Sequence, residues 1–181
     1  MDAFKMLGIT PRLVISEEEL RAAFREAGKT AHPDAGGGDE DFSRLCQAMD
    51  ILSSPSRRLR HWLELRGMEV DPRGVVDAAL MDLFGKVGEA TQRAESLIRK
   101  REETKSALGL AMLERETHLC REAVEQAIGW VEAAILTECE TFAVIEGSES
   151  LDLNAVSKCV RNLTFLEKWK AGLRSVFSRL V

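Results

Sequence analysis

The sequence predicts an all-α protein, in which short helices that include an antiparallel helical hairpin are followed by an antiparallel bundle of three long helices. Two observations predict this fold. Helix-forming residues dominate the chain, which has only 4 prolines and no tyrosine. Apolar residues also recur at intervals of three and four along most of the chain, as expected for helices that bury one face.

The composition is that of an ordinary globular protein and excludes some partners. The chain has 181 residues, of which 45% are hydrophobic and 30% charged, with a net charge of −5. This charge disfavours broad electrostatic binding to nucleic acid. No apolar run approaches a membrane span, and MDAFKMLGIT lacks the regions of a secretory signal. We expect no nucleic-acid partner and no membrane partner.

The 4 cysteines, Cys46, Cys120, Cys139 and Cys159, are far apart in the sequence, so a CxxC metal or redox motif is absent. Cys46 and Cys120 fall on apolar helical stripes and are expected to be buried free thiols. Free thiols are typical of a reducing compartment, which predicts a cytoplasmic location.

A break near residue 70 divides the chain. Gly67, Pro72 and Gly74 interrupt the helical periodicity there. We therefore predict two domains, over residues 1–68 and 75–181.

The N-terminal domain begins with a short helix over Ala3–Leu7, which ends at Gly8. Ser16 and Glu19 then form the pattern of a capping box at the start of the second helix. This helix has an apolar stripe made of Leu20, Phe24, Ala27 and Ala31.

The second helix must stop at His32, because Pro33 cannot continue a helix and disfavours helical geometry in the residue before it. The acidic run that starts at Asp39 favours the beginning of a third helix. Its predicted buried stripe comprises Phe42, Leu45, Cys46, Met49 and Leu52. Two such helices pack antiparallel, which places His32, Pro33 and Asp34 at the tip of a hairpin. Ser54 and Pro55 cap a basic fourth helix.

A basic ridge runs along the second helix, where Arg21, Arg25 and Lys29 are spaced four residues apart. Such a ridge is often only solvated, but its position beside a rigid, charged tip favours docking to a partner.

Catalysis is the alternative role for the tip, with His32 and Asp34 as a base and its partner. No nucleophile elbow, second carboxylate with a partner or metal-ligand spacing accompanies them. The other histidines, His61 and His118, lie alone on predicted helices and are expected to be surface or structural residues. We predict that the protein is not an enzyme.

The C-terminal domain is predicted to form three long amphipathic helices. The first begins at Val75, the second runs from about Lys105 to Ile145, and the third from about Leu153 to Leu180. Three helices with one apolar stripe each form an antiparallel bundle. Taken alone, such a bundle would serve equally as a spacer or as a dimerising coiled coil.

The stretch FREAGKTAHPDAGGGDEDFSRLCQAMDILSSPSRRLRHWL resembles the J domain of the DnaJ co-chaperone family. The basic helix, the His-Pro-Asp tripeptide, the glycine loop, the acidic start and the basic fourth helix all stand in the family's order. The resemblance covers about residues 2 to 66. The chain departs from the family at Ala31, where an aromatic is usual, and at Ala35, where a basic residue is usual.

This resemblance implies binding to a DnaK-type ATPase chaperone and stimulation of its ATP hydrolysis. His32, Pro33 and Asp34 would be the essential contacts, supported by the ridge of Arg21, Arg25 and Lys29.

A J domain followed by a short helical bundle also resembles one subgroup, the HscB-type co-chaperones of iron–sulfur cluster assembly. DAFKMLGITPRLVISEEEL resembles the start of that subgroup, and VSKCVRNLTFLEKWKAGL resembles its last helix. The likeness implies that the bundle binds an iron–sulfur cluster scaffold protein through Leu80, Met81, Phe84 and Phe165.

The chain departs from this subgroup in three ways. Gly85 and Gly88 stand where the family has acidic residues, and the stretch from about Thr104 to Ser150 is longer. A cysteine-bearing N-terminal extension, which some relatives have, is absent, so we expect no metal and no cofactor. The leading hypothesis is a co-chaperone that delivers the scaffold to a DnaK-type chaperone, and the alternative is a J-domain co-chaperone with another client. A helical interaction protein with an inactive J domain is a third reading, against which the intact tripeptide and ridge argue.

Overall fold

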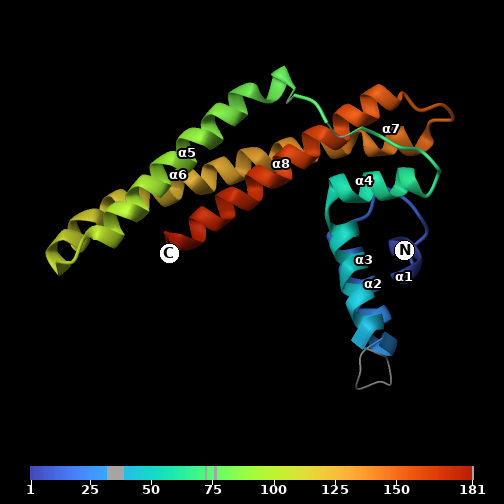
Figure 1. Ribbon diagram of the computed structural model, residues 1–181, viewed down its shortest axis with the longest axis horizontal. Helices are drawn as coiled ribbons and strands as arrows, with labels where there is room; N and C mark the ends of the chain where they lie inside the picture. Colours follow the sequence, from blue (N-terminus) through green and yellow to red (C-terminus); the bar gives the residue numbers. More distant parts are fainter. Residues whose placement is uncertain (32–38, 72, 76, 181) are drawn as a thin grey trace. The chain divides into compact units, whose positions relative to one another are not determined.

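The computed structural model describes residues 1–31, 39–71, 73–75 and 77–180 (Figure 1). Every regular element in these residues is helical, which confirms the predicted all-α class. The chain forms two compact units. We call residues 1–73 and 138–163 the N-terminal unit, and residues 74–137 and 164–181 the bundle unit. The domain boundaries predicted from sequence stay a prediction.

The N-terminal unit contains the four short helices expected from sequence, α1 (Ala3–Met6), α2 (Glu17–Ala31), α3 (Asp39–Ser53) and α4 (Pro55–Glu64). From later in the chain it contains α7 (Phe142–Gly147) and the first part of α8 (Leu153–Arg179). The helices α2 and α3 lie side by side as the predicted hairpin (Figure 1). Between them, the rings of Phe24 and Phe42 have centroids 6.4 Å apart.

Local sequence signals account for the ends of these helices. Asp2 caps α1 by accepting a hydrogen bond from the backbone N–H of Lys5, and Gly8 ends the helix with φ of 65°. The Ser54 side chain caps α4 by accepting from the backbone N–H of Arg57, and Pro55 follows in the first turn. Both the Gly8 end and the Ser54 cap confirm the sequence predictions.

The capping box at the start of α2 is only half formed. Ser16 Oγ accepts a hydrogen bond from the backbone N–H of Glu19 at 3.1 Å, as predicted. The Glu19 carboxylate binds the Arg12 guanidinium instead of closing the box. An ion pair to the preceding segment has replaced the reciprocal contact.

The bundle unit is built from η2 (Ala78–Leu80), α5 (Met81–Glu103), most of α6 (Ala107–Glu140) and the second half of α8 (Leu153–Arg179). Contacts between the helices show that α5 and α6 are antiparallel. Lys86 lies over the ring of Trp130, whereas Lys100 near the end of α5 pairs with Glu116 near the start of α6. This arrangement confirms the predicted bundle.

Each unit has its own apolar core. The core of the N-terminal unit includes Phe4, Leu13, Leu52, Leu59, Trp62, Leu63 and Phe142. The core of the bundle unit includes Ala94, Leu97, Val124, Ala127, Val131, Leu166 and Leu173. Full burial of a side chain such as leucine contributes roughly 1.5–3 kcal/mol relative to its exposed state.

Two predicted helices have different bounds. The helix expected from about Lys105 to Ile145 ends at Glu140, and α7 starts anew at Phe142. At the junction, Thr141 Oγ1 donates to the carbonyl of Glu138 at 2.7 Å. Such a side-chain hydrogen bond competes with the backbone hydrogen bonds that would continue the helix. The first helix of the bundle begins at Met81, after the 3-10 turn, rather than at Val75.

The prediction that Cys46 is buried is wrong, whereas Cys120 is buried as expected. The buried face of α3 is formed by Leu45, Ala48 and Leu52, and Cys46 lies beside this stripe on the exposed side. No helix in the described part of the chain is both long and apolar enough to cross a membrane.

Candidate functional site

The tripeptide His32, Pro33 and Asp34 lies outside the residues that the structure describes. Its place in the chain is the connection between the last residue of α2, Ala31, and the first residue of α3, Asp39. Its role in chaperone binding stays a prediction.

The predicted ridge is exposed on α2, but carboxylates occupy part of it. Arg21 pairs with Glu17 one turn earlier, and Lys29 Nζ lies 2.6 Å from Glu26 Oε2. Arg25 is exposed and forms no ion pair with any residue that the structure describes. Arg25 is therefore the ridge cation most available to an acidic partner.

The arginines of α4 serve the fold of the N-terminal unit. Arg58 is buried, donates to the carbonyl of Leu52 at 2.8 Å and lies over the ring of Phe142. Arg57 pairs with Asp50 on α3. The sequence predicted a basic helix here, and these contacts show that two of its cations hold the hairpin and α7 in place.

His61 is a structural residue, which is one of the two roles expected from the sequence. It is buried, and its Nε2 accepts a hydrogen bond from the backbone N–H of Ala3 at 3.0 Å. Its ring also stacks on Phe4, with centroids 5.7 Å apart. His118 is exposed and lies 3.3 Å from Glu122, one turn away on the same helix.

The four predicted client-binding residues lie in the bundle unit, and two of them meet at a tryptophan. Phe84 on α5 and Phe165 on α8 both contact Trp169, with ring centroids 5.4 Å and 6.3 Å apart respectively. Met81 and Phe84 are 51% and 49% exposed, and Leu80 and Phe165 are half-buried. The structure therefore joins Phe84 and Phe165 into one apolar cluster. The client-binding role stays a prediction.

Trp169 was missed by the sequence reasoning, although a signal was present. It follows Phe165 by four residues on α8, so both side chains project from the same helical face. Trp169 is half-buried and contacts both phenylalanine rings.

The glycines on α5 leave open space next to this cluster. The helix is continuous through Gly85 and Gly88, although glycine costs about 1 kcal/mol relative to alanine in a helix. A Cβ atom built at either position would meet no heavy atom within 4 Å. At these two positions close to Phe84, the helix therefore presents only its backbone and carries no charge.

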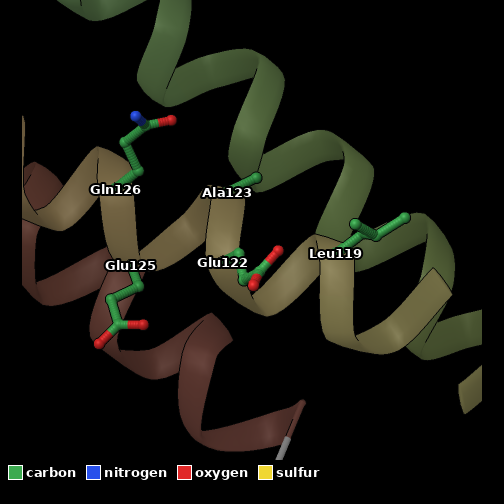
Figure 2. Close-up of a pocket in the computed structure, with 5 residues that line it drawn as sticks. All are labelled: Leu119, Glu122, Ala123, Glu125 and Gln126. Carbon is green, nitrogen blue, oxygen red and sulfur yellow. The ribbon is translucent and has the colours of Figure 1, made fainter. Parts of the chain in front are cut away.

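A shallow depression on α6 is lined by Leu119, Glu122, Ala123, Glu125 and Gln126 (Figure 2). Leu119 and Ala123 point toward α5, and Glu125 points away toward α8. The charged residues of the lining are Glu122 and Glu125.

The cysteines differ in their surroundings. Burial raises the pKa of the Cys159 thiol to about 12, and burial also raises that of Cys120. Cys159 lies 3.6 Å from Thr141 Oγ1, at the junction of α6 and α7. Within the described residues, no three His, Cys, Asp or Glu side chains gather as metal ligands.

Comparisons with known proteins identify the N-terminal part of the chain. Residues 2–61 match the family model of the DnaJ domain. Over 60 residues, the chain is 42% identical to the tetratricopeptide repeat and J domain-containing co-chaperone DNJ1 of Cryptococcus neoformans. Over 55 residues, it is 40% identical to chaperone protein dnaJ 3 of Arabidopsis thaliana. These matches cover 33% and 30% of the chain, which spans only 11% and 13% of the two relatives.

One solved structure matches over the full length of both chains. It is the chaperone HscB from Vibrio cholerae, with 21% sequence identity and a TM-score of 0.58. The TM-score establishes a common fold, and at 21% identity the likeness shows the fold alone. Residues 2–61 are therefore a J domain of the DnaJ family, in a chain whose fold is similar to that of HscB.

Proposed function

We propose that this protein is a J-domain co-chaperone that stimulates ATP hydrolysis by a DnaK-type chaperone and delivers an iron–sulfur cluster scaffold protein to it. One observation carries the proposal: a DnaJ domain that contains the His-Pro-Asp tripeptide occurs in a chain whose whole fold resembles HscB. The protein is not itself the ATPase in this proposal, and it acts in the cytoplasm.

The J domain would contact the chaperone through the tip and the ridge. Asp34 would pair with a cation on the ATPase, and a charge-assisted hydrogen bond of this kind is worth roughly 1.5–3 kcal/mol. Arg21, Arg25 and Lys29 would attract an acidic surface and raise the rate of encounter. Arg25 supports this role most directly, because it has no ion pair among the described residues.

The bundle unit would hold the client through Leu80, Met81, Phe84 and Phe165. The exposure of Met81 and Phe84, together with the ring contacts of Phe84 and Phe165 to Trp169, supports an apolar binding face. Binding energy usually concentrates in a few such anchors.

A different client is the second candidate function, and a specific observation favours it. Gly85 and Gly88 supply neither a charge nor a side chain at two positions close to Phe84. A client that needs acidic contacts would bind poorly to this face.

The test measures two quantities with purified proteins. Single-turnover ATP hydrolysis by a DnaK-type chaperone should accelerate when the protein is added, and titration calorimetry should detect binding of an iron–sulfur scaffold. Stimulation without scaffold binding would favour the second candidate. Absence of stimulation by the wild-type protein would refute the co-chaperone role.

A further inference from the structure

A stripe of partly exposed apolar side chains runs along α6 in the bundle unit, on the side next to α5. Leu108 and Met112 are each 75% exposed, Leu119 is 46% exposed and Trp130 is 40% exposed. Leu119 and Trp130 follow Leu108 at intervals of 11 residues, which is close to three helical turns. These four residues, which we call the α6 stripe, therefore lie along one line of the helix over about 33 Å.

Opposite charges flank the centre of the α6 stripe. Arg115 precedes Leu119 by four residues and Glu122 follows it by three, so both lie next to Leu119 on the helix surface. Arg115 is exposed and has no ion pair with a described residue. Glu122 is 59% exposed and lies 3.3 Å from the exposed His118. Both charges are available to a partner.

We propose that the α6 stripe binds the α6 stripe of a second copy of this chain, in an antiparallel and two-fold symmetric arrangement. The axis passes between His118 and Leu119. This register places Arg115 opposite Glu122 of the second copy, and the symmetry repeats the same pair on the other side of the axis. Leu119 then lies against its own copy.

The charges select this arrangement over a parallel one. A parallel pair with its two-fold axis along the helices would carry Arg115 and Glu122 of one copy to the opposite side of the interface from those of the other. No contact between Arg115 and Glu122 would then form. In the antiparallel pair, Leu108 lies opposite Gly129 and next to Trp130 of the second copy, so the exposed ends of the stripe cover each other.

The depression shown in Figure 2 lies beside the α6 stripe and would receive a side chain of the second copy. It is lined by Leu119, Glu122, Ala123, Glu125 and Gln126. In the proposed register, Met112 of the second copy lies opposite Glu125 and therefore over this depression. A methionine side chain is flexible and suits an irregular hollow.

Sedimentation of the full chain over a range of micromolar concentrations tests the proposal. Wild type should form a dimer as its concentration rises. Arg115→Glu or Glu122→Arg places like charges at two symmetric contacts, and each should weaken the dimer roughly tenfold. The double variant Arg115→Glu with Glu122→Arg should restore it, because the pair is exchanged in both copies. Leu136→Glu is the matched control, since Leu136 is 68% exposed on α6 but lies off the stripe.

Disulfide cross-linking tests the direction of the helices independently. In a Cys46→Ser background, Leu119→Cys lies near the axis and should cross-link under mild oxidation, whereas Leu108→Cys should not. Circular dichroism checks that every variant stays helical. A wild-type chain that is monomeric at high micromolar concentration overturns the proposal. A double charge reversal that fails to restore the dimer, or cross-linking through Leu108→Cys, overturns the antiparallel register.

Discussion

The carboxylate of Glu146 accepts a hydrogen bond from the backbone N–H of Leu13 at 2.9 Å, across 133 residues of sequence. Its second oxygen lies 3.4 Å from the backbone nitrogen of Val14. Glu146 belongs to α7, whereas Leu13 lies in the extended segment between α1 and α2. Together with Arg58 over the ring of Phe142, this contact binds α7 to the J domain within the N-terminal unit.

We expect Glu146→Ala to destabilise the N-terminal unit by about 1–3 kcal/mol, because it removes an ionised acceptor from the N–H of the buried Leu13. Glu146→Gln keeps one acceptor oxygen and should cost less. Urea unfolding measures both changes, and Glu149→Ala is the control, since Glu149 is exposed and close by in the same unit. Equal stability of the Glu146→Ala and Glu149→Ala variants would contradict this role.

Changes at the tip of the hairpin should alter stimulation of the chaperone but not the stability of the protein. We expect His32→Gln or Asp34→Asn to remove stimulation of ATP hydrolysis by the DnaK-type chaperone, because each change removes a polar contact to the partner. Helicity and melting temperature should stay unchanged. Single-turnover ATPase assays give the activity, and full stimulation by either variant would show that the tripeptide has no such role.

The basic ridge on α2 should make binding to the chaperone depend on salt concentration. Association with the chaperone should weaken as salt rises, because the Debye length falls to about 8 Å at physiological ionic strength. Arg21→Ala with Arg25→Ala should flatten that dependence. Of the single changes, Arg25→Ala should have the larger effect, because Arg21 already pairs with Glu17. An unchanged salt slope in the double variant would mean that the ridge is only solvated.

The client-face prediction separates the two binding functions. We expect Met81→Ala with Phe165→Ala to abolish capture of the scaffold protein and to leave stimulation of the chaperone intact. Trp169→Ala should also weaken capture, because Phe84 and Phe165 both rest on that ring. Loss of one anchor can cost about 2 kcal/mol or more.

Titration calorimetry measures capture, with Leu136→Ala as a control from an exposed apolar position elsewhere on α6. Because Gly85 and Gly88 carry no charge, scaffold binding should also depend less on salt than chaperone binding does. If wild type gives neither heat nor complex at high micromolar concentration, the iron–sulfur hypothesis is wrong and another client must be sought.

Local signals in the sequence were sufficient for most of the fold. The Ser54 cap, the Gly8 helix end and the start of α3 at Asp39 depend on residues within one turn of each other. The period of the apolar residues also predicted the bundle. The burial of Cys46 was wrongly predicted because an apolar pattern at intervals of three and four also includes residues next to the buried face of the helix.

Long-range contacts could not be predicted in the same way. The residues near Glu146 in the sequence do not indicate that its carboxylate accepts a hydrogen bond from Leu13. The periodicity of the apolar residues in α6 does not predict that the helix is interrupted at Thr141. The meeting of Phe84 with Trp169 depends on how α5 and α8 pack, which helical periodicity alone leaves open. Trp169 itself was within reach, because it stands four residues after Phe165 on one face.

Glu132 on α6 connects two cations of α8 within the bundle unit. Its Oε1 lies 2.8 Å from Lys170 Nζ and 3.0 Å from Arg174 Nη2. The hydrogen bond from Lys170, followed by the positive charges of Lys170 and Arg174, holds the pKa of Glu132 below its ordinary value of 4.5. A carboxylate whose pKa is lowered by folding stabilises the folded state only while it is ionised.

This stabilisation should be complete above about pH 4.5 and should disappear as the pH falls through the lowered pKa of folded Glu132. We expect Glu132→Gln to lower the free energy of unfolding at pH 7 by less than about 1 kcal/mol, because the side chain is partly exposed and water screens the ion pairs. The difference between variant and wild type should shrink steadily below pH 4.5. Urea unfolding of the variant and the wild type at several pH values measures this difference. A difference that stays constant from pH 7 to acid would mean that Glu132 acts by packing rather than by charge.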